Sequence, residues 1–312
     1  LWRPLSLYDG GFWLSFGAVF AVLAVVPVVQ DAFVRVSYSF QKQNADGAAL
    51  SAYFEGIREH MWQGSLQGLT VSIGINLVIF PILLYYFFEF PLYSFILNLF
   101  VIPLMSVLLF LGIAGSLFVL WCGPVSSLLF LVCGKILWIY QMSCKLTLHL
   151  PGARLVVGRP DVWQIVAYYG ILIIVLLLLR EKERLIEHVD MQKYAVSKSD
   201  ISMQKHVKRL RRFALTLGMA GIIVLTHRWG ERGKLTTVVL DVGQGDGIFM
   251  TGPKGGTYLV DGGSSDVKKA GQYRIEPFLK SQGVGMIDYV LISHGDSDHV
   301  NGVEELMERQ NI

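Results

Sequence analysis

The sequence predicts a polytopic α-helical membrane domain followed by the N-terminal part of an α/β domain. Charged residues make up only 16% of the 312 residues, against about 25% in an ordinary soluble domain. Long stretches carry no charge at all. From Lys234 onward the pattern changes to short β-rich runs, glycine turns and helical segments, which is typical of a layered α/β domain.

The long apolar runs define the membrane domain, residues 1–180. An apolar run of roughly 18 residues is long enough to cross a bilayer as a helix. Such runs lie at 11–30, 66–88, 91–120, 125–150 and 161–180, with a polar, extramembrane or interfacial segment at 31–65. We expect Pro103 to kink or break the third run, because proline removes a backbone donor. Gly123-Pro124 predicts a turn, and we expect the fifth helix to end at Arg180.

A basic segment follows the fifth run. Residues 180–212 contain ten Lys or Arg and five acids, and positive charge near membrane ends favours the cytoplasmic side. We therefore interpret residues 181–212 as a cytoplasmic linker. Residues 213–229 are apolar and at the short limit for a last span. If they cross, residues 234–312 lie on the extracytoplasmic side of the cell membrane.

The α/β domain spans residues 234–312. Strands are expected at 235–240, 247–251, 257–260 and 288–292, and helices at 274–282 and 299–309. The domain has seven basic and eleven acidic residues, so it lacks a general basic surface for a polyanion. A bound metal would have to supply the positive charge.

The densest chemistry follows the last expected strand, in Ser293-His294-Gly295-Asp296-Ser297-Asp298-His299. Two imidazoles and two carboxylates fall within six residues, and both are ligands of Zn and Mn. His294 and Asp296 can face one ion, and Asp298 and His299 a second. Two ions about 3.5–4 Å apart can hold a hydroxide and stabilise an in-line displacement at phosphorus. Asp298 would also orient the attacking water.

Two further aspartates are candidate supports for these ligands. Asp261 ends a strand before two glycines, and Asp246 ends a glycine turn, so each can accept a hydrogen bond from a ligand. A structural interpretation stays open for each motif. Residues 294–299 would then be a polar loop with Asp298 capping the next helix, and Asp241 and Asp246 would be ordinary turn residues.

The order of these motifs resembles the metallo-β-lactamase superfamily. Three motifs carry the resemblance: Asp241-Val242-Gly243-Gln244-Gly245-Asp246, Asp261-Gly262-Gly263 and His294-x-Asp296-x-Asp298-His299. The fold that it implies is αββα. Asp296 replaces the superfamily's usual second His, which makes the site richer in oxygen and Mn²⁺ as suitable as Zn²⁺. The superfamily completes its site with ligands further downstream, so we expect the site to be incomplete and inactive in residues 1–312 alone. Because the sequence starts at Leu1 rather than Met and stops at Ile312 within a helical pattern, we expect a fragment cut at both ends.

The variant with Asp at that position is similar to ComEC-type DNA internalisation proteins. The membrane half agrees, through Asp9-Gly10-Gly11-Phe12-Trp13-Leu14-Ser15-Phe16, Leu84-Tyr85-Tyr86-Phe87 and Leu97-Asn98-Leu99-Phe100-Val101-Ile102-Pro103-Leu104. The resemblance implies DNA uptake during transformation. One strand would pass the membrane domain, and a two-metal nuclease would degrade the other. It also implies contacts with membrane lipid, other DNA-uptake proteins and further copies of the chain.

A polar stripe marks the helix expected at 125–150. Lys135, Trp138, Lys145 and His149 share one helix face with Met142 at spacings of three and four. Ionisable groups in membrane helices usually face a bundle interior or a water path, so the stripe is a candidate DNA path with Lys for phosphate and Trp for base stacking. The alternative is an interfacial helix with snorkelling lysines.

Two other functions remain open. In the first, the chain is a transporter or scaffold whose metal domain is catalytically silent. In the second, the metal domain hydrolyses an ester other than nucleic acid. Metal identity, strand polarity and oligomeric state do not follow from the sequence.

Overall fold

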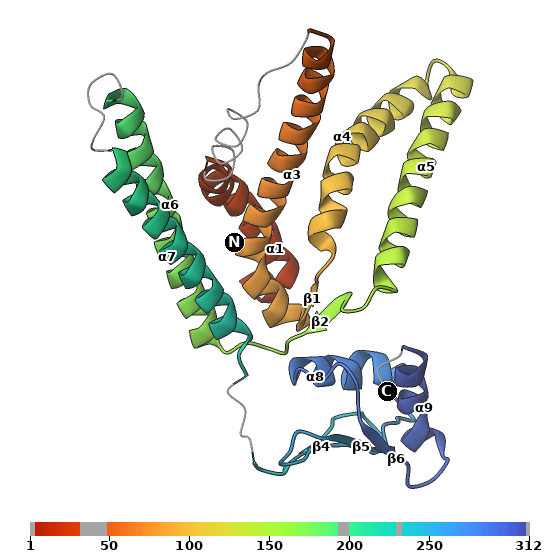
Figure 1. Ribbon diagram of the computed structural model, residues 1–312. Helices are drawn as coiled ribbons and strands as arrows, with labels where there is room; N and C mark the ends of the chain where they lie inside the picture. Colours follow the sequence, from red (N-terminus) through yellow and green to blue (C-terminus); the bar gives the residue numbers. More distant parts are fainter. Residues whose placement is uncertain (1–3, 32–48, 193–199, 229–232, 310–312) are drawn as a thin grey trace. The chain divides into compact units, whose positions relative to one another are not determined.

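The computed structural model describes residues 4–31, 49–192, 200–228 and 233–309 (Figure 1). Its contacts divide the chain into two compact units, which are described separately. The first comprises Leu1–Ile79, Pro91–Arg154 and Ile171–Gly218. The second comprises Phe80–Phe90, Leu155–Gly170 and Met219–Ile312.

Helices make up the apolar part of the chain. They are η1 (Pro4–Tyr8), α1 (Gly10–Phe20), η2 (Ala21–Val25), α3 (Ala49–Phe87), α4 (Ser94–Phe118), α5 (Gly123–Leu148), α6 (Val162–Gln192) and α7 (Asp200–Thr226). Five helical segments among the described residues are long and apolar enough to cross a membrane: Gly10–Asp31, Gly68–Phe87, Ile96–Phe118, Gly123–Leu148 and Val162–Glu181. The polytopic helical membrane region is thereby confirmed. Arg212–Thr226 is a shorter apolar helix.

Helix α4 continues through Pro103, so the proline does not break the helix, and the kink stays a prediction. Two other local expectations in this region were wrong. Gly123 and Pro124 begin α5 rather than form a turn, because proline is tolerated in the first helical turn, where its missing donor has no partner anyway. Helix α6 continues past Arg180 to Gln192. The segment interpreted as a linker, residues 181–212, therefore belongs to α6 and α7 wherever the structure describes it. Residues 193–199 of this segment, and residues 32–48 of the polar segment expected at 31–65, lie outside the described residues.

Helices α4 and α5 pack as an antiparallel pair in the first unit (Figure 1). The buried Ser126 hydroxyl donates to the Gly115 carbonyl at 2.8 Å, and Tyr140 Oη donates to the Val101 carbonyl at 2.9 Å. A Cβ atom at Gly115 would lie 3.2 Å from the Phe130 ring, so the glycine permits the close approach. Hydroxyl-to-carbonyl bonds of this kind hold helices together where no water competes.

Two sheets follow from the strands. Strands β1 (Glu89–Pro91) and β2 (Arg154–Val156) form a short two-stranded sheet. Strands β3 (Thr236–Val239), β4 (Ile248–Thr251), β5 (Thr257–Val260) and β6 (Tyr289–Leu291) form a four-stranded sheet in that order. The first three strands are antiparallel neighbours, and β6 runs parallel to β5. All four lie within the runs expected from the sequence.

The core of the α/β domain lies between one sheet face and the C-terminal helices. Phe249 and Leu259 of the sheet pack with side chains of η3 (Gly271–Ile275), α8 (Glu276–Ser281) and α9 (Ser297–Glu308). Figure 1 shows α8 and α9 over the same side of β4–β6. The domain is therefore layered, with helices packed on one face of the sheet, as the sequence predicted for an α/β domain.

The opposite face of the sheet is apolar and open. Its rows, given by the strand register, are Thr237, Met250, Tyr258 and Tyr289, and Val239, Ile248, Val260 and Leu291. Tyr258 and Tyr289 stack with centroids 5.0 Å apart, and Val239 is 77% exposed. A sheet face of this composition is typical of a layer inside a sandwich.

Candidate metal centre

The parallel pairing of β5 and β6 brings two of the predicted motifs to one edge of the sheet. Parallel strands end on the same side, so the residues after Val260 and Leu291 become neighbours. The backbone N–H of Asp261 donates to the Leu291 carbonyl at 2.8 Å, which extends the ladder by one residue. The Asp261-Gly262-Gly263 turn thus meets the loop that carries His294.

Asp261 turns its carboxylate into this edge. Its φ of +53° lies in the left-handed region, which Asp adopts more readily than most residues. The buried carboxylate accepts hydrogen bonds from Ser293 N and Ser293 Oγ, both at 2.8 Å. Burial raises the pKa of Asp261, but these two bonds and the nearby His299 ring outweigh it, so the pKa lies below its usual value. The residue is therefore a fixed anion.

Helix α9 positions the second half of the motif. Asp296 is its N-cap residue, and the Asp296 carbonyl accepts from the His299 N–H at 2.9 Å. The Asp296 side chain makes no capping hydrogen bond, and Asp298 lies inside the first turn. The alternative in which Asp298 caps the helix was therefore wrong, and both carboxylates are available for other partners.

Two glycines allow the start of α9 to approach the turns beside it. A Cβ atom at Gly263 would lie 2.4 Å from the Asp298 carbonyl carbon, and one at Gly245 would lie 2.5 Å from the Asp298 oxygen. Backbone atoms cannot move aside cheaply, so these positions exclude any side chain. The Gly262 N–H also donates to the His299 carbonyl at 2.9 Å. The glycine motifs thus hold Asp298 and His299 in place.

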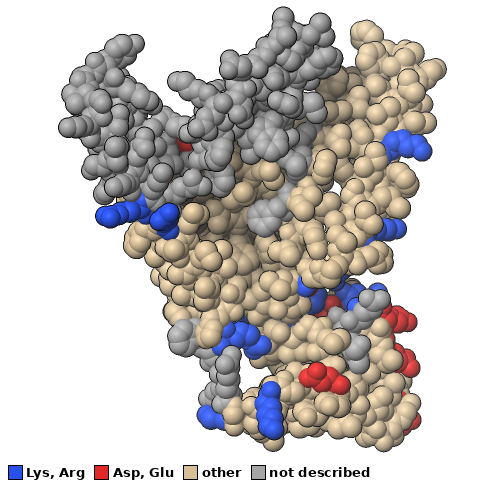
Figure 2. Space-filling model, in the orientation of Figure 1, with Lys and Arg blue, Asp and Glu red and all other residues tan. Residues whose placement is uncertain are grey.

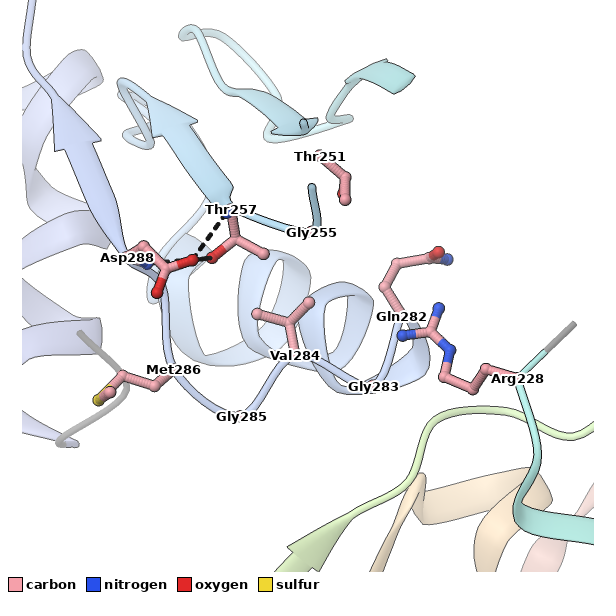
Figure 3. A pocket seen from close by; sticks show the side chains of 10 residues that line it. All are labelled: Arg228, Thr251, Gly255, Thr257, Gln282, Gly283, Val284, Gly285, Met286 and Asp288. Atoms are coloured by element: carbon pink, nitrogen blue, oxygen red, sulfur yellow. Dashed lines mark hydrogen bonds between the residues drawn. The ribbon is translucent and has the colours of Figure 1, made fainter. Parts of the chain in front are cut away.

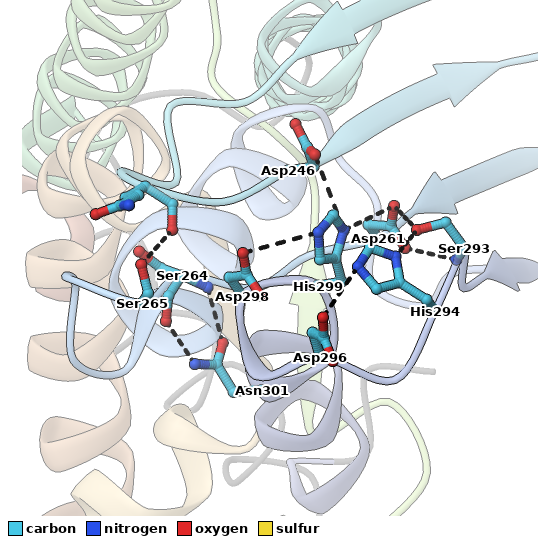
Figure 4. Close-up of polar contacts among 11 residues, drawn as sticks. Asp246, Asp261, Ser264, Ser265, Ser293, His294, Asp296, Asp298, His299 and Asn301 are labelled. Carbon is cyan, nitrogen blue, oxygen red and sulfur yellow. Dashed lines mark hydrogen bonds and ion pairs between the residues drawn. The ribbon is translucent and has the colours of Figure 1, made fainter.

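The two imidazole rings have similar neighbours at their Nδ1 and Nε2 atoms (Figure 4). His299 Nδ1 lies 3.2 Å from Asp261 Oδ2 and 3.9 Å from Asp246 Oδ2, and His299 Nε2 lies 3.8 Å from Asp298 Oδ2. His294 Nδ1 lies 2.9 Å from Ser293 Oγ, and its Nε2 lies 3.4 Å from Asp296 Oδ2.

In each ring, Nδ1 therefore faces a supporting group, Asp261 for His299 and Ser293 for His294. The Nε2 atom faces a predicted metal ligand, which is Asp298 for His299 and Asp296 for His294. Ser293 Oγ donates to Asp261, so it accepts from His294 Nδ1. The carboxylate at Nδ1 of His299 favours a proton there. Both tautomers leave an Nε2 lone pair free, and the ring centroids are 3.9 Å apart.

The residues fit a divalent metal in their chemistry. His299 Nδ1 is a buried nitrogen with no hydrogen bond of good geometry, although a carboxylate is close. Two Nε2 atoms and two aspartates form the donor set that Zn and Mn accept. Among the described residues, however, no group of three or more His, Cys, Asp or Glu side chains is already arranged to hold an ion. The ligands are paired rather than assembled.

Sequence reasoning missed two supporting residues. Ser293 links Asp261 to His294, and its position directly between strand β6 and the first His was the available signal. Asn301 exchanges two hydrogen bonds with the backbone of Ser264, at 3.0 and 2.6 Å, which ties α9 to the Asp261 turn. Asp241, left open above, forms an exposed ion pair with Arg274 at 2.7 Å and does not face the imidazoles.

The stripe on α5 lies away from its partner helix. Buried Ser126, Cys133 and Ile136 mark the face that packs on α4. Lys135 and Trp138 each follow a buried residue by two positions, about 200° around the helix. Lys135, Trp138, Lys145 and His149 are all exposed. Lys135, Trp138 and Lys145 thus lie on a face of α5 opposite α4, and His149 is the C-cap residue that follows the helix.

Comparison with protein families now places the chain. A model of the family described as competence protein matches residues 1–182, more than half of the chain. The chain belongs to the competence protein family. A second model, of the metallo-beta-lactamase superfamily, matches residues 240–312. This match covers every residue of the candidate metal centre.

A curated relative aligns with the whole chain. The chain is 20% identical over 327 aligned positions to ComE operon protein 3 of Bacillus subtilis (strain 168). The alignment covers 100% of the chain and 35% of that protein, so this competence-family chain spans about a third of the relative's length. No solved structure matches the chain.

Proposed function

We propose that this competence-family chain takes part in DNA uptake across the cell membrane, and that its C-terminal domain hydrolyses the strand that is not transported. One observation supports the second half most strongly. Two imidazoles with free Nε2 atoms, and the aspartates beside them, meet at the ends of β5 and β6, at the start of α9. The membrane region supports the first half, with its family match over residues 1–182.

The proposed roles follow from the contacts. His294 and Asp296 would hold one divalent ion, and Asp298 and His299 a second. Asp298 would orient the attacking water. Asp261 holds the proton on His299 Nδ1, and Asp246, whose N–H donates to the Asp298 carbonyl at 3.4 Å, faces the same nitrogen. Zn²⁺ or Mn²⁺ suits the mixed nitrogen and oxygen donors, and would supply positive charge and lower the pKa of a bound water.

The net negative charge of the α/β domain supports a metal-dependent mechanism, because a bound cation would attract the DNA. The α/β domain has eleven acidic and seven basic residues, and both kinds are visible over it in Figure 2, whereas the described surface of the apolar helices is largely uncharged. An acidic surface repels a polyanion, so the attraction has to come from within the site. We place this domain on the extracytoplasmic side, where the incoming duplex arrives.

The same proposal assigns the α5 stripe to the DNA path. Lys135 and Lys145 would contact phosphates, Trp138 would stack on bases, and His149 would lie at the end of the path. Because this face is opposite α4, the path requires another element against α5. A further copy of the chain or another DNA-uptake protein would supply it, with lipid around the remaining helices.

The test uses the natural full-length protein in competent cells. The variants Asp298→Ala and His299→Ala are compared with Glu304→Gln, an exposed carboxylate of α9 outside the site. Degradation of the second strand is followed with end-labelled duplex DNA, while membrane insertion is checked by blotting. The first two variants should abolish degradation and the third should not. Unchanged degradation by Asp298→Ala would refute the nuclease assignment.

One observation favours a different function. The ligands are paired but no three of them are assembled around one point in the described part of the chain. A transporter or scaffold with a silent metal domain would have this property. Purified full-length protein loaded with Mn²⁺ or Zn²⁺ distinguishes the two, because a silent domain cleaves neither DNA nor other esters. Cleavage of a non-nucleic-acid ester alone would change the substrate class.

A further inference from the structure

The second unit also contains a polar pocket, which is lined by none of the residues of the candidate metal centre. Its volume is about 670 Å³. The residues that define it are Tyr85, Phe88, Arg159, Asp161, Arg228 and Gln282. They come from the end of α3, the segment before α6, the segment after α7 and the end of α8. None of them belongs to the motifs considered above for metal.

The walls of this pocket are fixed by backbone contacts. Phe88 has a φ of +63°, an unfavourable conformation for an aromatic residue. Its carbonyl accepts from Val157 N and Gly158 N at 3.0 and 3.1 Å, which holds it there. A Cβ atom at Gly158 would lie 3.1 Å from Gly283 N, and Arg159 N donates to the Ser281 carbonyl at 2.9 Å. The pocket is therefore preformed.

Arg159 presents a guanidinium stacked on an aromatic ring. Its Cζ lies 4.2 Å from the centroid of the Tyr85 ring, and Nη2 donates to the Tyr85 hydroxyl. No carboxylate among the described residues forms an ion pair with Arg159. A stacked arginine keeps its remaining N–H groups directed in one plane, which suits the oxygens of a phosphate.

Arg228 supplies a second cation. It also lines a neighbouring pocket of about 370 Å³ (Figure 3), where its side chain reaches toward Gln282 beside Gly283. Within the described chain it too has no ion-pair partner. Asp161 is the only acid that lines the larger pocket, as far as the structure describes it.

We propose that this pocket binds a phosphodiester of single-stranded nucleic acid, with Arg159 and Arg228 on the phosphate and Tyr85 and Phe88 beside the base. Two unpaired guanidinium groups and two aromatic rings are the combination that recognises a single strand without reading its sequence. A lipid headgroup would use the cations but leave the rings without a role. The assignment rests on the proposed function, which makes nucleic acid the substrate.

Binding is tested on the full chain in nanodiscs of neutral lipid with EDTA present. The probe is a fluorescent 20-nucleotide oligothymidine, and anisotropy gives Kd at several salt concentrations. The double variant Arg159→Gln/Arg228→Gln should weaken binding roughly tenfold at low salt. It should reduce the slope of log Kd against log salt by about 1.4, because each lost phosphate contact on a single strand removes about 0.7. Lys254→Gln, which removes an exposed charge outside the pocket, should change neither.

Four further variants separate the contribution of the rings to binding from that of the charges. Tyr85→Leu should weaken binding without changing the salt slope, whereas Tyr85→Phe keeps the ring and should bind nearly as the parent does. Asp161→Asn should tighten binding, because it removes the pocket's carboxylate. Unchanged thermal unfolding of each variant shows that the loss is not one of folding. Arg159→Lys keeps the charge without the planar fork, so it should keep the salt slope but bind the oligonucleotide more weakly than the parent does.

An unchanged Kd and slope in the double arginine variant would overturn the proposal. A lipid headgroup site would be identified instead if the double arginine variant bound anionic lipid more weakly than the parent but bound the oligonucleotide equally well. Competition by inorganic phosphate alone would identify a free-phosphate site. EDTA keeps this test separate from catalysis, so a protein that binds the oligonucleotide here but never cleaves DNA refutes the nuclease and not the pocket.

Discussion

His299 Nδ1 lies 3.2 Å from Asp261 Oδ2, and the same oxygen accepts a hydrogen bond from Ser293 Oγ at 2.8 Å. One buried carboxylate thus contacts the last His of the motif directly and the first His through a serine. Its low pKa keeps it charged at neutral pH. Asp261 is therefore the common support of both imidazoles.

The first prediction concerns this support. Asp261→Asn keeps the size and tolerates the same left-handed φ, but removes the negative charge at His299 Nδ1. We expect metal affinity to fall about 10–100-fold, the usual effect of losing such a partner. Titration of the metal-free full-length protein with Mn²⁺ or Zn²⁺ measures it. Asp266→Asn, which removes a carboxylate bound to Gln244 N at 2.7 Å, is the matched control. Equal affinity in both variants would contradict the role of Asp261.

The second prediction tests the close approach behind the ligands. Gly263→Ala places a methyl group 2.4 Å from the Asp298 carbonyl carbon and 2.5 Å from His299 N. The start of α9 must shift, so we expect a loss of about 1–3 kcal/mol in stability and loss of metal binding. Thermal unfolding and metal titration measure these. Gly256→Ala meets only ordinary contacts, 3.4 Å from Tyr258 Oη, and should be tolerated. A Gly263→Ala protein with parent stability would show that the backbone adapts.

Periodicity predicted the elements of this chain well, because each signal was local. The four strands of the α/β domain fall inside the expected runs, and the five long apolar helices follow from hydropathy. The errors lay at element ends. Helix α6 passes Arg180 and runs to Gln192, since a charged residue ends an apolar run without ending a helix.

The sequence named Asp261 and Asp246 as supports of the site but not Ser293 or Asn301, and the ligand roles of the two imidazoles stay predictions. His294 and His299 could be named from spacing alone. The contact of Asp261 with Ser293 depends on the parallel register of β5 and β6, across 32 positions of the chain. The pocket with Arg159 and Arg228 draws on four separate segments. No local pattern contains that information, because it arises from long-range packing.

The third prediction concerns pH. Glu276, buried at the start of α8, pairs with Lys280 Nζ at 2.9 Å and Arg309 Nε at 2.5 Å. Burial raises the pKa of Glu276, but the hydrogen bonds and charges of Arg309 and Lys280 outweigh it, so the folded pKa lies below the ordinary 4.5. A depressed folded pKa means that the unfolded chain takes up the proton first. The stabilisation is thus complete above the unfolded value and lost as the pH falls from 4.5 through the folded pKa.

Thermal unfolding of the full-length protein at pH 3–7 measures this effect. We expect Glu276→Gln to lower the unfolding temperature at neutral pH and to flatten its fall below pH 4.5, because the titrating group is gone. Glu304→Gln removes an exposed carboxylate of α9 and should leave the profile almost unchanged. Parallel profiles for the parent and Glu276→Gln would mean that other carboxylates control the acid transition.

The fourth prediction tests the stripe on α5. Lys135 and Lys145 lie on the face opposite α4, where a single strand would have to pass if this face forms the path. The double change Lys135→Gln/Lys145→Gln removes both charges and should reduce transformation roughly tenfold, because phosphate contacts depend on charge. The double change to Arg keeps both charges and should retain most of the activity. Transformation frequency is measured against membrane abundance. If the lysines only reach toward lipid headgroups, both double variants will transform equally well, since snorkelling places no demand on the strand.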